Sequence, residues 1–246
     1  MYHFFVSPTD ISGHDIYIRG ADHNHIKNVL RMKKGETLSV SDGVSENEYR
    51  CHIEGFEEDA VHLRLDFIKE ADTELPVEIC LLQGLPKADK MEFIIQKAVE
   101  LGIDEVIPVA TGRSIVKLDE KKAEAKVRRW QGIAEAAAKQ SMRNKIPGIG
   151  KVMNFKEAIE YTRDMDVKLI PYELAKDFDR TREVIGSIGK GKRVALFIGP
   201  EGGFEEEEVT CAEAEGFIPI TLGKRILRTE TAAMVVLSWL LYILEQ

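Results

Sequence analysis

Two apolar runs near the carboxyl end of the chain constrain its fold more than any other feature. The runs, Val194–Ile198 and Phe217–Leu222, have the length and the apolar character of buried strands. Each run leads directly into a loop rich in glycine, arginine or threonine, and each loop opens a predicted helix. Repeated strand–loop–helix units predict a parallel α/β sheet with both loops at its carboxyl edge. Because open α/β sheets bind ligands at that edge, we expect a binding site there.

The first loop, residues 199–203, reads Gly-Pro-Glu-Gly-Gly and lets a ligand approach its backbone closely. A tight turn between a strand and a helix would also explain such glycines. The loop is not a phosphate-binding P-loop, because no Gly-Lys-Ser or Gly-Lys-Thr follows, and it does not match G-x-G-x-x-G. The next residues, Glu205 to Glu208, would repel a phosphate and suit the start of a helix. This order predicts a neutral or cationic ligand and argues against a nucleotide hydrolase.

The second loop and the start of the next helix, residues 222–233, read Leu-Gly-Lys-Arg-Ile-Leu-Arg-Thr-Glu-Thr-Ala-Ala. Together with the first loop, this sequence closely resembles the C-terminal signature of the RsmE family. The resemblance extends along the whole chain in the same order. It includes His25–Arg31, Gly35-Glu36, Lys87, Lys90, Glu92–Gly102, Arg113-Ser114, Trp130, Glu135-Ala136, Gln140–Arg143 and Pro171–Glu173.

Members of the RsmE family are SPOUT-superfamily enzymes that use S-adenosylmethionine to methylate N3 of a specific uridine in 16S ribosomal RNA of the small subunit. The resemblance implies a PUA-like β-barrel domain that binds RNA, over residues 1–72. It implies a SPOUT α/β methyltransferase domain with a C-terminal trefoil knot over residues 73–246. It also implies a homodimer. The apolar last helix offers an interface for it, although this helix could equally be interior core within one chain.

The cofactor is expected in the two loops and beside the end of the strand at residues 169–172, as the resemblance implies. Backbone groups of loops with small side chains can read an adenine and a ribose. The alternative for the side chains of Leu222, Ile226 and Leu227 is simple core packing. The residues expected to bind S-adenosylmethionine are Leu169, Pro171, Tyr172, Gly199, Pro200, Glu201, Gly203, Leu222, Gly223, Ile226, Leu227, Arg228 and Thr231.

Methylation at uridine N3 requires loss of a proton, because this nitrogen is largely protonated at neutral pH. A general base or stabilisation of the uridine anion is therefore needed. Arg228 could stabilise charge on the uracil oxygens, and Glu201 or Glu230 could accept the proton. A structural ion pair between Arg228 and Glu230 is the alternative. Neither loop holds a cysteine, which disfavours a covalent pyrimidine adduct.

The charge of the chain is unevenly distributed. The 246 residues carry a net charge of -8, yet residues 112–151 hold 11 Lys or Arg against 4 Asp or Glu. Residues 19–34 form a second basic segment. Two basic segments in an acidic protein suit contact with a polyanion, although a solvated helix face explains part of the longer one. The residues expected to contact ribosomal RNA are Lys27, Arg31, Lys33, Lys34, Arg113, Arg128, Arg129 and Arg143.

The remaining patterns outline the domains and the compartment. Short strands with one helix, at about Asp22–Met32, fill the first 70 residues, and a linker is expected at Glu70–Pro76. Strands then alternate with helices. The three cysteines have no metal spacing and imply neither a metal site nor a disulfide framework, which favours a cytoplasmic location. The apolar stretch Ala232–Leu244 is too short to span a membrane, so no membrane partner is expected.

Two other functions stay open at this point. A related SPOUT enzyme that methylates a ribose 2'-O or guanine N1 would have a similar pocket. A non-catalytic RNA-binding factor of ribosome assembly could retain the pocket without turnover, although the intact sequence Arg228-Thr229-Glu230-Thr231 argues against this.

Overall fold

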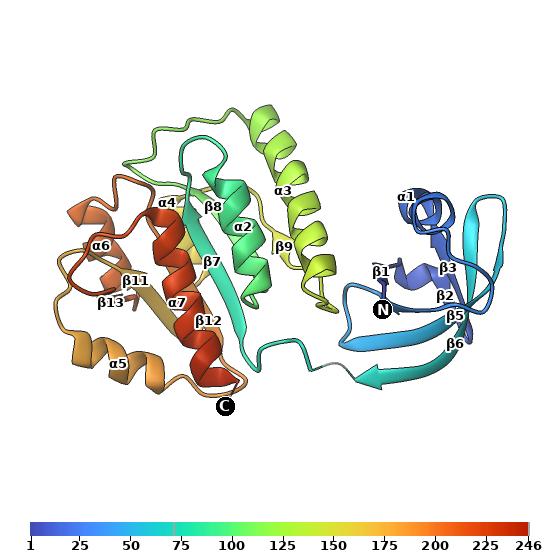
Figure 1. The fold of residues 1–246 in the computed structure, drawn as a ribbon. Helices are drawn as coiled ribbons and strands as arrows, with labels where there is room; N and C mark the ends of the chain where they lie inside the picture. Colours follow the sequence, from blue (N-terminus) through green and yellow to red (C-terminus); the bar gives the residue numbers. More distant parts are fainter. Residues whose placement is uncertain (71, 246) are drawn as a thin grey trace. The chain divides into compact units, whose positions relative to one another are not determined.

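The computed structural model describes residues 1–70 and 72–245, and its contacts divide the chain into two compact units. The first unit comprises residues 1–74 and 138–146, and the second comprises residues 75–137 and those from 147 onward. Figure 1 traces the elements of both units along the chain. Within the predicted linker, Ala71 lies outside the described residues. No sequence feature indicated that residues 138–146 return to the first unit.

The first unit is built on a six-stranded sheet. In spatial order the strands are β1 (His3–Phe5), β4 (Thr37–Ser41), β5 (Asn47–Phe56), β6 (Ala60–Glu70), β3 (Asp15–Arg19) and β2 (Ile11–Ser12). All neighbours are antiparallel except β1 and β4, which run parallel. Alternate apolar residues of these strands form one buried core, which includes Ile16, Ile18, Leu38, Val40, Ile53, Val61 and Leu63.

The helix of the first unit differs from the single helix predicted over Asp22–Met32. A short 3-10 turn, η1 (Pro8–Asp10), comes first in the chain. Later, an α-helical turn, α1 (Gly20–Asn24), continues directly as a π-helical turn, η2 (His25–Val29). The backbone N–H of Leu30 bonds to the carbonyl of His25, which is the wider π spacing. Arg31 then has a φ of 54°, a left-handed conformation that ends the helix.

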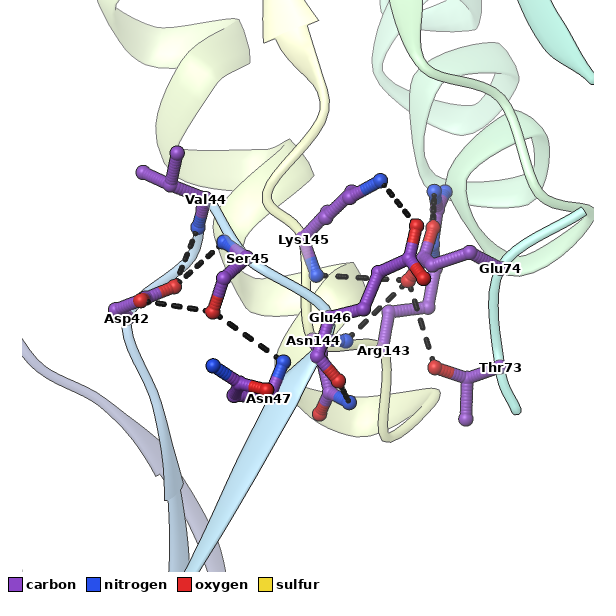
Figure 2. A network of polar contacts seen from close by, with 10 residues as sticks. All are labelled: Asp42, Val44, Ser45, Glu46, Asn47, Thr73, Glu74, Arg143, Asn144 and Lys145. Carbon is purple, nitrogen blue, oxygen red and sulfur yellow. Dashed lines mark hydrogen bonds and ion pairs between the residues drawn. The ribbon is translucent and has the colours of Figure 1, made fainter. Parts of the chain in front are cut away.

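Residues 138–146, here called the return segment, are bound to the rest of the first unit by a buried ion pair. Arg143 bonds to the carboxylate of Glu74, and their side chains are only 4% and 8% exposed. The backbone N–H of Asn144 also donates to Glu74. Figure 2 shows these groups converging on Glu74, with Thr73 and Lys145 beside them. Arg143 is thus the buried partner of a carboxylate, which explains why this part of the chain belongs to the first unit.

A second set of contacts connects the return segment to the turn after β4. Ser41 donates to the side-chain oxygen of Asn144 over 2.8 Å, and Asn144 donates to the carbonyl of Glu46 over 3.2 Å. Lys145 pairs with the Glu46 carboxylate at 2.7 Å, as Figure 2 also shows. The segment is therefore held by both backbone and side-chain bonds.

The second unit is an α/β structure on a parallel sheet. The strand order is β10 (Met153–Asn154), β8 (Glu105–Ala110), β7 (Glu78–Gly84), β12 (Arg193–Ile198), β11 (Val167–Pro171) and β13 (Ile218–Ile220), with β9 (Gly148–Ile149) also on β8. Every pairing in this sheet is parallel. The predicted strand Val194–Ile198 lies in the middle of the sheet and is buried on both faces, as its uninterrupted apolar sequence indicated.

Helices cover both faces of this sheet. Residues of α4 (Phe155–Tyr161) and α6 (Glu206–Ala214) join one core with Leu82, Ile107 and Phe197 of the strands. On the other side, α2 (Lys90–Glu100) packs against α7 (Thr229–Leu244), and Figure 1 shows the two helices side by side. Helix α5 (Phe178–Gly186) packs on α7 and β13, and α3 (Glu120–Gln140) is the longest helix. None of the helices in the described part of the chain could cross a membrane.

The ion pair of the return segment gives a stability prediction. Changing Arg143 to Leu leaves Glu74 buried without its cation, so the free energy of unfolding should fall by about 3–5 kcal/mol. Chemical denaturation, followed by a probe in the first unit, measures this loss. Arg128→Leu on α3 is the matched control, because Arg128 is 72% exposed and should change stability by no more than about 0.5 kcal/mol. Equal stabilities of the two variants would contradict the assigned role of Arg143.

Candidate functional site

The predicted site lies at the carboxyl ends of three neighbouring strands in the second unit. Strand β12 ends at Ile198 and β13 ends at Ile220, and each is followed by one of the two loops. Strand β11 lies between them and ends at Pro171. Residues at or just after all three strand ends line a cavity of about 480 Å³. This volume is typical of a small-molecule site.

Glycines keep the backbone of both loops accessible. Gly203 has a φ of 67° and Gly223 a φ of 103°, and a Cβ at either position would meet no atom within 4 Å. Gly199 is packed more tightly, because a Cβ there would lie 3.1 Å from the carbonyl carbon of Gly203. Backbone strain therefore explains glycine at 203 and 223, and packing explains it at 199.

A chain of hydrogen bonds connects the two loops behind the cavity. The hydroxyl of Thr229, at the start of α7, donates to the carbonyl of Gly199 over 2.6 Å. The same hydroxyl accepts from Nε2 of Gln83 over 2.9 Å, and Gln83 is wholly buried at the end of β7. The next residue, Gly84, packs so closely on the first loop that a Cβ would lie 2.6 Å from the nitrogen of Pro200. The position of the first loop therefore depends on β7 and α7.

Charged groups form a cluster at one wall of the cavity. Nζ of Lys90 lies 2.8 Å from Oε1 of Glu201 and 3.6 Å from Oε2 of Glu230. Burial raises the pKa of Glu201, but hydrogen bonds from Lys90 and from backbone N–H groups outweigh burial and leave that pKa below its ordinary value. The hydrogen bond to Glu201 raises the pKa of Lys90. At neutral pH the cluster therefore contains an ionised Glu201 and a cationic Lys90.

Residues after β8 also contact the first loop. Arg113 donates to the carbonyl of Gly202 over 2.9 Å. The backbone N–H of Gly112 donates to the carboxylate of Glu208 over 2.7 Å. The Arg113-Ser114 motif thus lies beside the first loop within the second unit.

Most of the predicted cofactor residues line the cavity. Eleven do so, namely Pro171, Tyr172, Gly199, Pro200, Glu201, Gly203, Leu222, Gly223, Ile226, Leu227 and Arg228. The other two, Leu169 and Thr231, are not among the described residues that line the cavity. Leu169 is wholly buried within β11, and Thr231 is exposed in the first turn of α7. Direct contact with a ligand in this cavity is therefore not proposed for these two residues.

The three predicted catalytic residues divide in the same way. Arg228 and Glu201 line the cavity, whereas Glu230 is not among the described lining residues and lies 3.6 Å from Lys90, which is. Sequence reasoning missed Lys90 and Thr229 as parts of the site, although both belong to motifs that carried the family resemblance. Their roles depend on contacts with residues more than 25 positions away, which no local pattern shows.

The predicted RNA contacts fall on both units. In the first unit, Lys27, Arg31 and Lys33 are exposed, and Lys34 is exposed but paired with Glu54. In the second unit, Arg128 and Arg129 are exposed on α3 and pair with Glu124 and Glu92. The expectation for Arg143 is corrected, because its side chain is buried against Glu74 and does not reach solvent.

Comparison with known families assigns both units. An RNA methyltransferase PUA domain matches residues 18–66, and an RNA methyltransferase domain matches residues 73–241. The first unit is accordingly a PUA-type domain, and the second unit, with its parallel α/β sheet, is the methyltransferase domain.

Individual relatives agree with this assignment. The ribosomal RNA small subunit methyltransferase E of Bacillus subtilis is 37% identical over 92% of this chain and 89% of its own length. The enzyme of the same name from Neisseria gonorrhoeae, solved bound to S-adenosyl methionine, has a TM-score of 0.83 with 31% identity over 97% of this chain and 95% of that chain. A Legionella pneumophila protein solved with the bound cofactor has the same TM-score with 33% identity over 97% and 96%. The chain therefore belongs to the family of ribosomal RNA small subunit methyltransferase E.

Proposed function

We propose that the chain is an S-adenosylmethionine-dependent methyltransferase that modifies N3 of a uridine in 16S ribosomal RNA of the small subunit. The cavity between the two glycine-rich loops is the observation that carries this proposal. Family membership supports the methyl-transfer activity, the cofactor and the ribosomal RNA substrate. The choice of N3 rests on the RsmE resemblance of the two loops.

The residues around the cavity fit S-adenosylmethionine. Ile198, Phe204, Leu222 and Leu227 give apolar walls for an adenine, and the open backbone at Gly223 leaves amide groups to read its edge. No Lys follows the first loop at the P-loop spacing, which suits a ligand without phosphates. The remaining predicted cofactor residues that line the cavity would hold the ribose and the amino-acid portion.

When bound, the cofactor supplies a methyl group on a sulfonium centre. The two loops fix its position, and they exclude water from the reacting face. The hydrogen bonds from Thr229 to Gly199 and from Gln83 to Thr229 keep the loops in one arrangement before any ligand arrives. Preorganisation of this kind aligns the reacting groups for an in-line transfer.

Removal of the N3 proton is assigned to the charged wall of the cavity. Arg228 lines the cavity and is placed to stabilise negative charge on the uracil oxygens. Glu201 is ionised at neutral pH and also lines the cavity, so it is the first candidate to accept the proton. Glu230 acts indirectly, through its ion pair with Lys90 of the cavity wall.

RNA contact is assigned to exposed cations of both domains. In the PUA-type domain, Lys27, Arg31 and Lys33 surround the π-helical turn and the left-handed residue that follows it. π-Helical turns are frequent at functional sites, and exposed cations attract RNA phosphates. In the methyltransferase domain, Arg113, Arg128 and Arg129 remain proposed contacts, although each already has a partner within the protein.

Three further features extend the proposal. Family membership supports a trefoil knot in the C-terminal part of the methyltransferase domain and a PUA fold closed as a barrel. A ribosomal RNA substrate supports a cytoplasmic location. We also propose a homodimer, because α5 and α7 expose an apolar groove of about 200 Å³ lined by Phe178, Ile185, Trp239, Tyr242 and Ile243.

The reaction product tests the proposed function. We expect the purified protein to transfer label from S-adenosylmethionine to small ribosomal subunits that lack native modifications, and to form N3-methyluridine. The labelled nucleoside is identified by chromatography after digestion. If the product is a ribose-methylated nucleoside or N1-methylguanosine, the protein is still a methyltransferase, but its target is not uridine N3. Cofactor binding without any transfer to subunits or to free RNA would favour the non-catalytic assembly factor.

Charge reversal at Arg31 tests the RNA surface. Arg31→Glu should weaken RNA binding by about tenfold at moderate salt, because it removes a phosphate contact and adds a repulsive charge. Cofactor affinity should not change. Lys69→Glu is the matched control, since Lys69 is also an exposed cation of the PUA-type domain but lies on β6, outside the 25–34 segment. Fluorescence anisotropy with labelled RNA that shows equal affinities for both variants would overturn the assignment of Arg31.

Light scattering tests the proposed homodimer. We expect a mass of two chains at micromolar concentration. Tyr242→Glu should shift the mass toward one chain, because it puts a charge into the apolar groove on α5 and α7. A wild-type mass of one chain would contradict the proposal.

A further inference from the structure

Lys90 is the first residue of α2, and it faces two segments that are separated from it by more than a hundred positions. Its ammonium group pairs with Glu201 of the first loop at 2.8 Å. The same nitrogen lies 3.6 Å from Glu230, which follows the second loop in the first turn of α7. One cation is therefore shared by two carboxylates, one from the first loop and one from the helix that follows the second loop.

The carboxylate of Glu201 is held in a defined orientation by donors from the start of α2. Oε1 accepts from Nζ of Lys90 and from the backbone N–H of Lys87, at 2.8 and 3.1 Å. The same backbone N–H lies 3.4 Å from Oε2, so both oxygens of the carboxylate have a donor and its rotation is restricted. Because Glu201 lines the cavity, Lys90 determines how this carboxylate faces a bound ligand.

Glu230 depends on Lys90 in a different way. Its Oε2 atom is buried and has no hydrogen-bond partner among the described residues. The ion pair that this oxygen makes there is with Lys90. A buried carboxylate oxygen is destabilised when no cation is near it, so the environment of Glu230 depends on Lys90. The other charged groups near Lys90 are Glu201, which repels Glu230, and Arg228.

The packing of the two loops does not depend on this ion pair. Thr229 and Gln83 connect the loops by hydrogen bonds that involve neither Lys90 nor the two glutamates. Gly84 also packs directly against Pro200. Removal of the ammonium group should therefore change charges and orientations at the cavity wall while the cavity itself persists.

We propose that Lys90 is a positioning residue for methyl transfer: it fixes the Glu201 carboxylate in the cavity wall and pairs with the Glu230 carboxylate in the first turn of α7. The part of this inference that concerns catalysis rests on the proposed function. The part that concerns Glu230 is a statement about folding and charge, and it can be tested without turnover.

The catalytic part is tested by Lys90→Met with saturating subunits and S-adenosylmethionine. We expect kcat to fall by about tenfold to a hundredfold, because Glu201 loses its orientation. The Kd of S-adenosylmethionine, measured by calorimetry, should stay within about threefold of the wild-type value, because the loops keep their other connections. Lys90→Arg, which keeps the cation, should recover most of kcat. Gly203→Val is the reference for a damaged cavity, since a β-branched side chain disfavours its φ of 67° and should weaken cofactor binding.

The pairing with Glu230 is tested by a double-mutant cycle in thermal unfolding at neutral pH. Lys90→Met leaves the buried Oε2 atom of Glu230 without its cation, so Tm should fall. Glu230→Gln removes the other partner of the same ion pair. In the double variant Lys90→Met/Glu230→Gln the two losses of Tm should therefore not add.

Lys97→Met is the matched control, because Lys97 lies on the same helix and pairs with Glu100 away from the cavity. It should leave kcat unchanged, and its effect on Tm should add to that of Glu230→Gln. Wild-type kcat in Lys90→Met, or a fall in kcat that only accompanies lost cofactor affinity, would overturn the positioning role. Additive losses of Tm in the double variant Lys90→Met/Glu230→Gln would overturn the pairing with Glu230. An inactive wild-type protein would instead refute the proposed function, and the unfolding experiments would still decide the charge pairing.

Discussion

The hydroxyl of Thr229 connects segments that are far apart in the sequence, and the candidate site depends on this connection. It accepts a hydrogen bond from Gln83 at the end of β7 and donates one to Gly199 after β12. Strands β7 and β12 are neighbours in the parallel sheet, so their carboxyl ends already lie at the same edge. The hydroxyl adds the start of α7, which follows the second loop. A Val at this position would leave the buried amide of Gln83 without this partner, at a cost of about 1–3 kcal/mol.

Local sequence patterns were sufficient to predict those elements whose own apolar residues mark them as buried strands. The run Val194–Ile198 was predicted as a strand, and it forms the last five residues of β12. The run Phe217–Leu222 was too long a prediction, because only Ile218–Ile220 pairs with β11. The helix at residues 22–32 was predicted without its π-helical turn, in which Ile26 is buried in the core. The return segment was missed entirely, since Arg143 finds Glu74 only through tertiary structure.

The same distinction applies to the site. Glycines and apolar residues of the two loops identified the cavity, because loop composition and strand ends are visible in the sequence. The roles of individual charged residues could not be predicted from the composition of the loops. Glu201 and Glu230 looked equivalent as nearby carboxylates, yet Glu201 lines the cavity and Glu230 has a buried oxygen that accepts no hydrogen bond from the described residues. Their difference arises from Lys90, which lies more than a hundred positions earlier in the chain. Contacts at this separation carry no signal in a single sequence.

The helix that follows the first loop explains why this site differs from a phosphate site of similar topology. Phosphate sites use the backbone N–H groups at a helix N-terminus, where the helix dipole favours an anion. In α6 those positions are occupied by the protein's own acids, Glu206, Glu207 and Glu208. Glu208 accepts from the backbone N–H of Glu205 over 3.0 Å and also from that of Gly112. The protein's own carboxylates therefore already supply the negative charge that the helix N-terminus favours. They would repel a phosphate group placed there. A loop of this kind selects a ligand that brings a positive charge and no phosphate, which is the charge pattern of a sulfonium cofactor.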